Sequence, residues 1–453
     1  MSTRAVDRGN ENTSDGAFAL GALTTGVGNT GIGYDALRFT TTGRFNTGVG
    51  YNVLHQNTTG YHNTAVGVDA LYNNTVNDNT AVGYGALFQN TTGSRNTATG
   101  ENALSNNTTG KFNTANGAEA LINNNGNDNT ATGFEALFSN TSGFGNTANG
   151  FSALFYNTTG SNNTASGLYA LFNNTASYNT ATGFKALQSN TSGNTNTANG
   201  YVALYSNTIG GGNTADGTQA LYSNISGGGN TADGYFALVN STGNNNIALG
   251  SHAGSNLTTG DNNIDIGAVG VTGEANTIRI GKAGTQTRAF VAGIRGVTTV
   301  NANAVPVVID SAGQLGTVSS SERFKNEIKP MDQTSEAILG LKPVTFHYKS
   351  DSKGTPQFGL IAEEVAEVNP DLVVRNDDGQ IYTVRYDAVN AMLLNEFLKE
   401  HKVVEEQGAT VAELKKQIAT LIATVKQQAA QIQRVRAQIE VTKPAPQTVL
   451  NNQ

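Results

Sequence analysis

Residues 146–162, NTANGFSALFYNTTGSN, contain the repeat that determines the fold of the first part of this chain. The pattern N-T-A-x-G-x-x-A-L-x-x-N-T-[TS]-G-x-x recurs at spacings of 17 or 16 residues. A unit this short cannot bury an apolar face of its own, whereas stacked units share a continuous core. The period therefore predicts a β-solenoid or β-roll rod over residues 12–282, in a protein that is mainly β. The units start at Asn12, Asn29, Asn46, Asn63, Asn79, Asn96, Asn113, Asn129, Asn146, Asn163, Asn179, Asn196, Asn213, Asn230, Asn246 and Asn263.

Each position of the unit carries its own structural prediction, counted here from the first Asn. The N-T-A-x run suits a short strand, and the constant Gly at position 5 indicates a positive φ or a close neighbouring chain. Ala136 and Leu137, at positions 8 and 9, predict a thin internal core. Aromatics at positions 6 and 10, such as Phe134 and Phe138, would share a face if this stretch formed one helical turn. With strands about 4.8 Å apart, sixteen rungs predict a rod on the order of 75 Å long.

The repeated asparagines have a structural interpretation and two functional alternatives. An Asn at a fixed position of every rung is expected to form an amide ladder and to cap the turn. The Asn-x-Thr triplets also match the acceptor of N-glycosylation. A regular Thr/Asn array could instead bind ice, mineral or glycan.

The rod resembles the stacked head repeats of trimeric autotransporter adhesins, whose units also carry a short strand followed by Gly. The similarity covers residues 12 to about 282 and is clearest in residues 246–250, NIALG, and 276–281, NTIRIG. The units here are longer than the usual ones of that family, so the cross-section need not be the same. The resemblance implies an adhesin-like role.

Composition excludes several classes of protein and site. Residues 1–270 hold only 7 Lys/Arg and 14 Asp/Glu, a charge-poor and weakly acidic balance that does not favour a nucleic-acid partner. With no Cys and five scattered His, we expect neither a disulfide framework nor a metal site, and no motif indicates a cofactor. No stretch approaches the roughly 20 apolar residues of a membrane helix, and no secretory signal is recognisable at the N-terminus.

A different kind of sequence begins at Ser319, after a connector at residues 283–318 that reads as a few short strands and turns. Ser320 and Lys325 lie close together here. A serine hydroxyl needs a base to act as a nucleophile, and a lysine serves when burial keeps it neutral. Five residues of separation do not place two side chains on one helix face, so a helix-capping serine is the plainer interpretation of the spacing alone.

From Ser319 to about Glu400 the chain resembles the C-terminal intramolecular chaperone domain of phage endosialidase tail spikes, a self-cleaving serine peptidase family. The matching blocks follow one order along the chain. They are Ser320–Lys325, which corresponds to the family pattern Ser-Asp-x-Arg-x-Lys, then Leu341–Val344 with Phe346 and Tyr348, Phe358–Val365, Tyr386, Leu393, Leu394, Lys399 and Glu400.

The resemblance implies a trimerising chaperone that folds the upstream fibre and then cuts itself off. Carried over to this sequence, Ser320 is the nucleophile and Lys325 the general base, with cleavage between Ser319 and Ser320 in a single turnover on no external substrate. Ser321 stands where the family pattern has Asp. Three consecutive serines leave the scissile bond open by one residue.

The last part of the chain predicts a coiled coil over residues 403–442. Apolar residues recur at alternating steps of three and four, and Gln428 is the one polar member of the series. We expect Gly408 to interrupt the helix that begins near Tyr386, and Pro444 to end the tail. The heptads do not separate a dimer from a trimer, and an amphipathic helix lying on its own domain is the alternative. The series is Val411, Leu414, Ile418, Leu421, Val425, Gln428, Ile432, Val435 and Ile439.

Together these segments predict a homotrimeric fibre of six parts: an N-terminal tail (1–11), the rod (12–282), the connector (283–318), a small α+β chaperone and self-cleaving domain (319–402), the coiled coil (403–442) and a disordered tail (443–453). We expect it outside the cell, at a cell surface or on a phage-like particle, with a surface glycan or receptor as partner. The alternatives are a fibre that does not cleave and a glycan-degrading tail-spike-like enzyme. Against that enzyme, no unit introduces the paired carboxylates of glycoside hydrolysis, since Asp216 and Asp233 repeat as a surface stripe.

Overall fold

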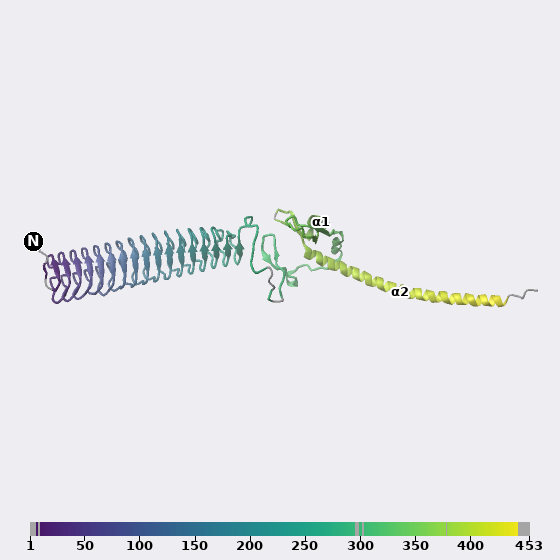
Figure 1. The fold of residues 1–453 in the computed structure, drawn as a ribbon, viewed down its shortest axis with the longest axis horizontal. Coiled ribbons are helices and arrows are strands. Elements are labelled where there is room, and N and C mark those ends of the chain that lie inside the picture. The colour runs from purple at the N-terminus through teal and green to yellow at the C-terminus, as the bar shows by residue number, and fades with distance from the viewer. Residues whose placement is uncertain (1–5, 8–9, 295–298, 301–302, 377, 443–453) are drawn as a thin grey trace, which may run out of the picture. The chain divides into compact units, whose positions relative to one another are not determined.

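The computed structural model divides into two compact units, Met1–Val291 and Ala292–Gln453 (Figure 1). It describes residues 6–7, 10–294, 299–300, 303–376 and 378–442. The tail expected at residues 443–453 lies outside this described part. Within it, no helix is both long enough and apolar enough to cross a bilayer.

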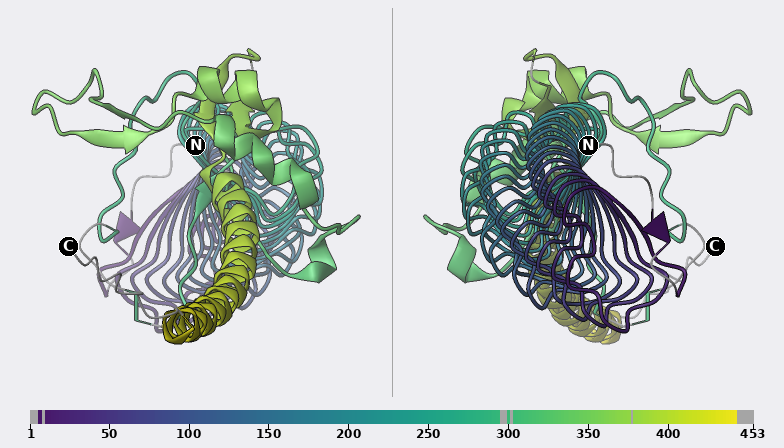
Figure 2. Two further views of the ribbon diagram at one scale, coloured as in Figure 1. Left: turned by 90° about the vertical axis from the view of Figure 1, so that its right-hand side faces the viewer. Right: turned by 90° about the vertical axis from the view of Figure 1, so that its left-hand side faces the viewer.

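The first unit is a β-solenoid in which every repeat contributes one short strand to a single parallel sheet, seen as stacked arrows in Figure 1. Viewed along the rod, each rung is turned slightly from the one before it (Figure 2). A two-residue strand, β1 (Val6–Asp7), pairs antiparallel with β2 at the start. The parallel strands are β2 (Thr13–Asp15), β3 (Thr30–Ile32), β4 (Thr47–Val49), β5 (Thr64–Val66), β6 (Thr80–Val82), β7 (Thr97–Thr99), β8 (Thr114–Asn116), β9 (Thr130–Thr132), β10 (Thr147–Asn149), β11 (Thr164–Ser166), β12 (Thr180–Thr182), β13 (Thr197–Asn199), β14 (Thr214–Asp216), β15 (Thr231–Asp233), β16 (Ile247–Leu249), β17 (Ile264–Ile266) and β18 (Ile278–Ile280).

Equivalent residues of successive repeats pair in register, which confirms the rung of about 17 residues. Thr147 of β10 lies opposite Thr130 of β9, and the other two residues of each strand follow. Gly150, at position 5, meets both conditions expected of that glycine. Its φ is +143°, and a Cβ added to it would lie 2.5 Å from the carbonyl oxygen of Gly167 in the next rung. The spacing between rungs therefore depends on this position having no side chain.

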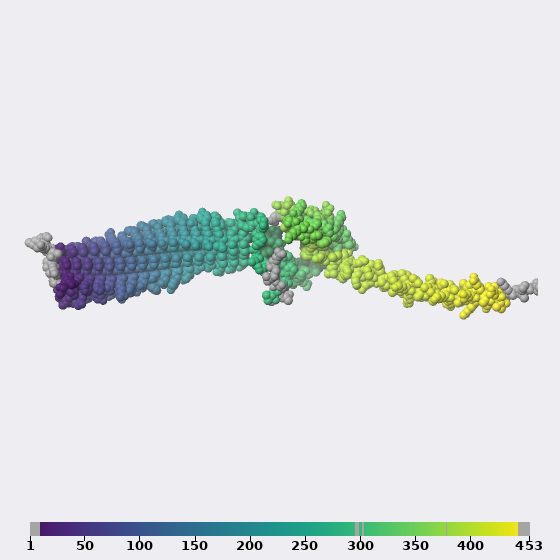
Figure 3. Space-filling model, viewed as in Figure 1, coloured from purple at the N-terminus to yellow at the C-terminus, as the bar shows by residue number. Residues whose placement is uncertain are grey.

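The rod's core is a column of small and medium apolar side chains. Ala148, in the middle of β10, points inward, together with Ala153 and Leu154 of the same rung, and all three are completely buried. The core extends in this way from Ala19 to Leu257. The predicted Ala-Leu core is confirmed, and the strand alanine adds a third inward position. In Figure 3 the repeat is visible on the outside as rows of atoms running along the rod.

The helical turn expected between positions 6 and 10 is wrong. Glu135 and Leu137, at positions 7 and 9, both have a φ of 55°, and left-handed residues at alternate positions are incompatible with an α-helical turn. Aromatic rings at one position therefore stack face to face on their equivalents in the next rung, while contacts within a rung, such as Phe155 with Tyr156, are edge-on. Phe138 and Phe155 stack with ring centroids 4.9 Å apart and planes 6° apart.

Two buried asparagine columns run through the rod and confirm the predicted amide ladder. Asn146 donates its backbone N–H to Oδ1 of Asn129 in the preceding rung (3.0 Å) and its side-chain amide to the carbonyl oxygen of Gly160 (2.8 Å). Asn157 forms the second column, donating to Oδ1 of Asn140 at 2.9 Å. Because these amides are completely buried and bonded, they are structural groups and not exposed glycosylation acceptors.

The second unit contains a short hairpin, a small α+β body and one long helix. The hairpin falls in the connector and pairs β19 (Val308–Ile309) with β20 (Leu315–Gly316). The body has a core of Val365, Leu372, Val373, Val384 and Met392. Its elements are the 3-10 helices η1 (Glu322–Phe324), η2 (Asp332–Gly340) and η3 (Pro370–Leu372), the hairpins β21 (Val344–Phe346) with β22 (Gln357–Gly359) and β23 (Val373–Arg375) with β24 (Ile381–Val384), and the helix α1 (Ala362–Val368).

The long helix α2 (Tyr386–Val441) has 56 residues and continues without a break through Gly408. The expected interruption at Gly408 is therefore wrong. A helical glycine costs about 1 kcal/mol relative to Ala, and the helix on either side is long enough to absorb that cost. Residues 400–442 are all exposed, so this part of α2 does not lie on its own domain.

Candidate functional site

The segment predicted to carry chemistry is a short exposed turn at the start of the small domain. The 3-10 helix η1 is closed by two backbone hydrogen bonds, from Phe324 N–H to the Ser321 carbonyl (3.1 Å) and from Lys325 N–H to the Glu322 carbonyl (2.9 Å). Ser321 is the N-cap of η1 but makes no side-chain capping bond. The capping-serine interpretation therefore lacks the hydrogen bond that would support it.

Ser320 and Lys325 lie on either side of η1, and both are exposed. Among the described residues, neither the Ser320 hydroxyl nor the Lys325 ammonium group has a hydrogen-bond partner. One neighbouring hydroxyl is engaged, since Oγ of Ser319 accepts the backbone N–H of Ser321 at 3.3 Å. In the single chain Ser320 and Lys325 are close in sequence, but no hydrogen bond joins their side chains. No described residue buries Lys325 in the single chain.

A second serine, Ser335 of η2, is completely buried in a polar cluster that the sequence did not reveal. Its hydroxyl contacts the carboxylate of Glu396 and accepts hydrogen bonds from Asn395 Nδ2 (2.7 Å) and Lys399 Nζ (3.3 Å), all three on α2. In the sequence, this region was marked only by Lys399 and Glu400, which belong to the blocks that match the family, and they indicated no role for Ser335.

The cluster contains a serine and a lysine, as a catalytic Ser–Lys pair would, but its hydrogen bonds join the two helices η2 and α2. Lys399 also donates to Glu396 at 2.7 Å. The hydrogen bond to Glu396 raises the pKa of Lys399, and the same bond, followed by that from Ser335, lowers the pKa of Glu396. A lysine held in its charged form cannot accept a proton from a serine. The cluster therefore attaches η2 to α2 through charge-assisted hydrogen bonds.

Beside this cluster the small domain has an open apolar groove. Tyr386, at the start of α2, closes one end by accepting the backbone N–H of Leu360 at its hydroxyl (3.0 Å). Phe358 is 80% exposed in this groove and Leu393 is 57% exposed. Large apolar side chains continue along the exposed side of α2 at Leu394, Phe397 and Leu398. The groove is lined by Ile338, Leu341, Pro343, Val344, Thr345, Phe358, Gly359, Leu360, Tyr386, Val389 and Leu393.

In the rod, Asp216 and Asp233 lie directly opposite each other on β14 and β15 and are exposed, as expected of a surface stripe. One further carboxylate of the rod does lie at an inward position. Asp265 occupies the inward position of β17, where the pattern has Ala, and is only 1% exposed. Neither of its carboxylate oxygens has a hydrogen-bond partner within the described residues.

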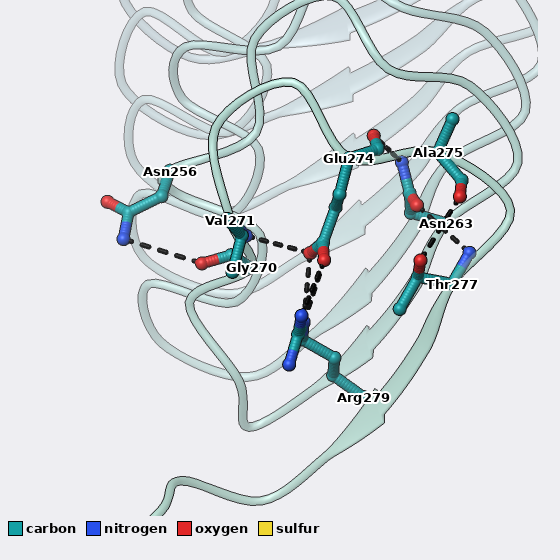
Figure 4. Close-up of polar contacts among 8 residues, drawn as sticks. All are labelled: Asn256, Asn263, Gly270, Val271, Glu274, Ala275, Thr277 and Arg279. Carbon is teal, nitrogen blue, oxygen red and sulfur yellow. Dashed lines mark hydrogen bonds and ion pairs between the residues drawn. The ribbon is translucent and has the colours of Figure 1, made fainter. Parts of the chain in front are cut away.

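Burial, and next the nearby Glu274, raise the pKa of Asp265 to about 6. Glu274 itself is bonded to Arg279, with the closest contact 2.7 Å, and accepts the Val271 N–H (Figure 4). One carboxylate is thus sealed in the core and the other is neutralised by an arginine. Glycoside hydrolysis needs two carboxyl groups that face a sugar from opposite sides, and this arrangement does not provide them.

Residues 320–374 match the family model described as chaperone of endosialidase. The match begins at Ser320, the first residue of the predicted dyad. No curated protein and no solved structure matches the chain. The chain thus carries an endosialidase-type chaperone segment near its C-terminus, preceded by a long β-solenoid and followed by a long helix.

Proposed function

We propose that this protein is a homotrimeric fibre whose C-terminal chaperone domain assembles three chains and then cuts itself from the fibre at Ser320. The observation that carries the proposal is the match to the endosialidase chaperone family, which starts at that serine. The mature product is the rod, with a structural or adhesive role like that of a tail fibre or surface adhesin. A cell-surface glycan or receptor is its proposed partner, and its place is outside the cell or on a phage-like particle.

The exposed apolar surfaces of the second unit support assembly of several copies. Leu414 and Ile418 of α2 are 50% and 55% exposed in the single chain, although their heptad spacing is that of a coiled-coil seam. The groove containing Phe358 is a second large uncovered apolar surface in the same unit. Soluble monomers rarely leave such surfaces open.

In this proposal, cleavage starts once a neighbouring chain covers Ser320 and Lys325 and brings their side chains together. The Lys325 amine takes the proton of the Ser320 hydroxyl while Oγ attacks the Ser319 carbonyl carbon. The bond from that carbon to the Ser320 nitrogen breaks, the nitrogen takes up the proton, and the Ser319 acyl group is left as an ester on Oγ. Water then hydrolyses the ester to a Ser319 carboxylate and a free Ser320 hydroxyl. Because the lone chain leaves Lys325 solvated, assembly gates the reaction.

The test is the intact mass and denaturing gel pattern of freshly purified full-length protein beside Ser320→Ala and Lys325→Ala. We expect wild type to yield residues 1–319 and 320–453, and both variants to remain whole. Ser319→Ala and Ser321→Ala serve as matched controls that should still cleave, and the fragment mass identifies the scissile bond. Unchanged processing of Ser320→Ala would refute the assigned nucleophile. A wild type that is trimeric but uncut would make the domain a retained trimerisation cap.

A further inference from the structure

The outward face of the rod's sheet changes character over its last three strands. From β2 to β17 the first and third side chains of each strand point outward and the middle one is buried, as the exposure of β13 and β16 illustrates. In β18, the last strand, the middle residue Arg279 is exposed as well and pairs with Glu274. From β2 to β15 the first outward residue is always Thr. In β16, β17 and β18 both outward residues are apolar. They are Ile247, Leu249, Ile264, Ile266, Ile278 and Ile280, named here the isoleucine face.

The isoleucine face is contiguous and open. Register pairing places Ile247 beside Ile264 and Ile264 beside Ile278, with the second outward column aligned in the same way. Ile264 is partly exposed, whereas the last strand is the most open, with Ile278 65% and Ile280 75% exposed. A contiguous apolar patch of this kind on a soluble protein marks a surface that another molecule covers.

The rod does not need these side chains for its own fold. Its core is built from the inward residues, such as Ala248 of β16, on the other side of the sheet. The preceding rungs fold the same backbone with outward threonines, for example Thr197 and Thr214, whose hydroxyls make no hydrogen bond within the described chain. The change from Thr to Ile therefore alters what the face contacts and leaves the rung itself unchanged.

We propose that the isoleucine face packs against the same face of two further copies of this chain, so that three rods join at their C-terminal ends. The proposal rests on the proposed homotrimer and adds where the rods meet. An apolar face without a charged side chain is complementary to itself, as a closed symmetric assembly requires. The heptads of α2, in the same chain, hold the three copies together and raise the local concentration of each face for the others.

The absence of cysteine from the whole sequence gives a direct test. In full-length protein that also carries Ser320→Ala, which blocks the proposed self-cleavage and keeps α2 attached, the variants Ile264→Cys and Ile280→Cys are each oxidised mildly and run on a non-reducing gel. Residues around a shared axis come close enough for one disulfide between two chains. Thr259→Cys is the matched control, because Thr259 is exposed on a turn between β16 and β17 and its side chain has no hydrogen bond. We expect a two-chain band from both isoleucine positions and none from Thr259.

A second pair of variants separates this proposal from the proposed trimer. Ile264→Lys combined with Ile280→Cys should slow cross-linking at least tenfold while light scattering still reports three chains, since α2 is untouched. A trimer in which Ile264→Cys and Ile280→Cys stay unlinked would overturn the proposed joint and leave the trimer standing. A protein that scatters as a monomer would instead overturn the homotrimer on which the joint depends.

Discussion

The rod and the second unit differ in how much of their apolar surface a single chain buries. In the rod most repeats bury an Ala and a Leu of their own completely, as at Ala153 and Leu154. In the second unit five residues form the core, while Leu414 and Ile418 of α2 stand about half exposed. The rod therefore buries its core within one chain, whereas the second unit leaves large apolar side chains exposed that the proposed trimer would cover. In this proposal the C-terminal part directs assembly, and the isoleucine face is where the rods contact one another.

The largest effect is predicted for a substitution in α2, which should separate the assembled chains and leave the rod folded. Ile418→Asp places a carboxylate in the seam of each helix and removes three buried side chains. At about 1.5–3 kcal/mol for each, the trimer loses roughly 5–9 kcal/mol. Light scattering should report single chains, while the circular dichroism of the rod persists. Ala430→Asp, on the opposite side of the heptad, is the control and should remain trimeric. Loss of the rod signal together with the trimer would show that the rod is not self-sufficient.

In the rod the position expected to be most sensitive to substitution is a buried polar residue, Asn146. Asn146→Leu leaves the backbone N–H of Asn163, now bonded to Oδ1 of Asn146 at 3.0 Å, without a partner. It also removes one of the two hydrogen bonds of the Gly160 carbonyl, which keeps the bond from Asn157. One stranded buried group at roughly 1–3 kcal/mol and one lost hydrogen bond at about 1 kcal/mol predict a loss of about 2–4 kcal/mol. Hydrogen exchange of the neighbouring rungs measures it. Asn149→Leu, exposed on the same rung, should change little, and equal effects from the two would argue against the ladder.

A smaller effect concerns Asp265 and depends on pH. Its pKa is about 6 in the folded rod against an ordinary value of 3.8, so the folded state holds the proton more tightly than the unfolded state. Stability at β17 and β18 is therefore highest below pH 4, falls as the pH rises toward 6, and is lower by up to about 3 kcal/mol above that. The charged groups that face Asp265 are Glu274 and Arg279.

Asp265→Ala restores the residue of the pattern and should remove this dependence. Hydrogen exchange of the last rungs at pH 4 and pH 7 is the measurement, with exposed Asp216→Ala as the control. Wild type should lose protection at the higher pH and the Ala variant should not. If both lose it equally, another group is responsible.

The smallest expected effect is at Gly408, where α2 continues through a residue of low helix propensity. Gly408→Ala should stabilise the helix by about 1 kcal/mol per chain, because the position is exposed and Ala has the higher helix propensity. Thermal melting of the full-length protein followed at 222 nm checks this. A destabilised variant would mean that the helix bends or ends there in the assembled fibre.

The sequence alone determined the features that depend on local repetition. A period of 17 residues, a constant Gly and a constant Asn specify stacked rungs, close backbone approach and an amide ladder, because each rung meets only its equivalent neighbour. The close approach of Gly150 to the next rung and the hydrogen bond from Asn146 to Asn129 confirm these expectations. The apolar spacing around Ile418 likewise predicted a helix there, although the sequence was expected to interrupt it at Gly408 and the structure does not. At the candidate site the motif located Ser320 and Lys325 but not the contacts that would join them.

Only the tertiary structure decided features that depend on residues far apart or on backbone conformation. The left-handed φ of Leu137 replaces the helical turn, since the chain must close a rung within 17 residues. The cluster around Ser335 joins η2 to a part of α2 more than 55 residues away. The repeat places Asp265 where the pattern has Ala, but its missing hydrogen-bond partners became evident only from the neighbours that surround it. Burial is a property of the packed rungs, which no single repeat contains.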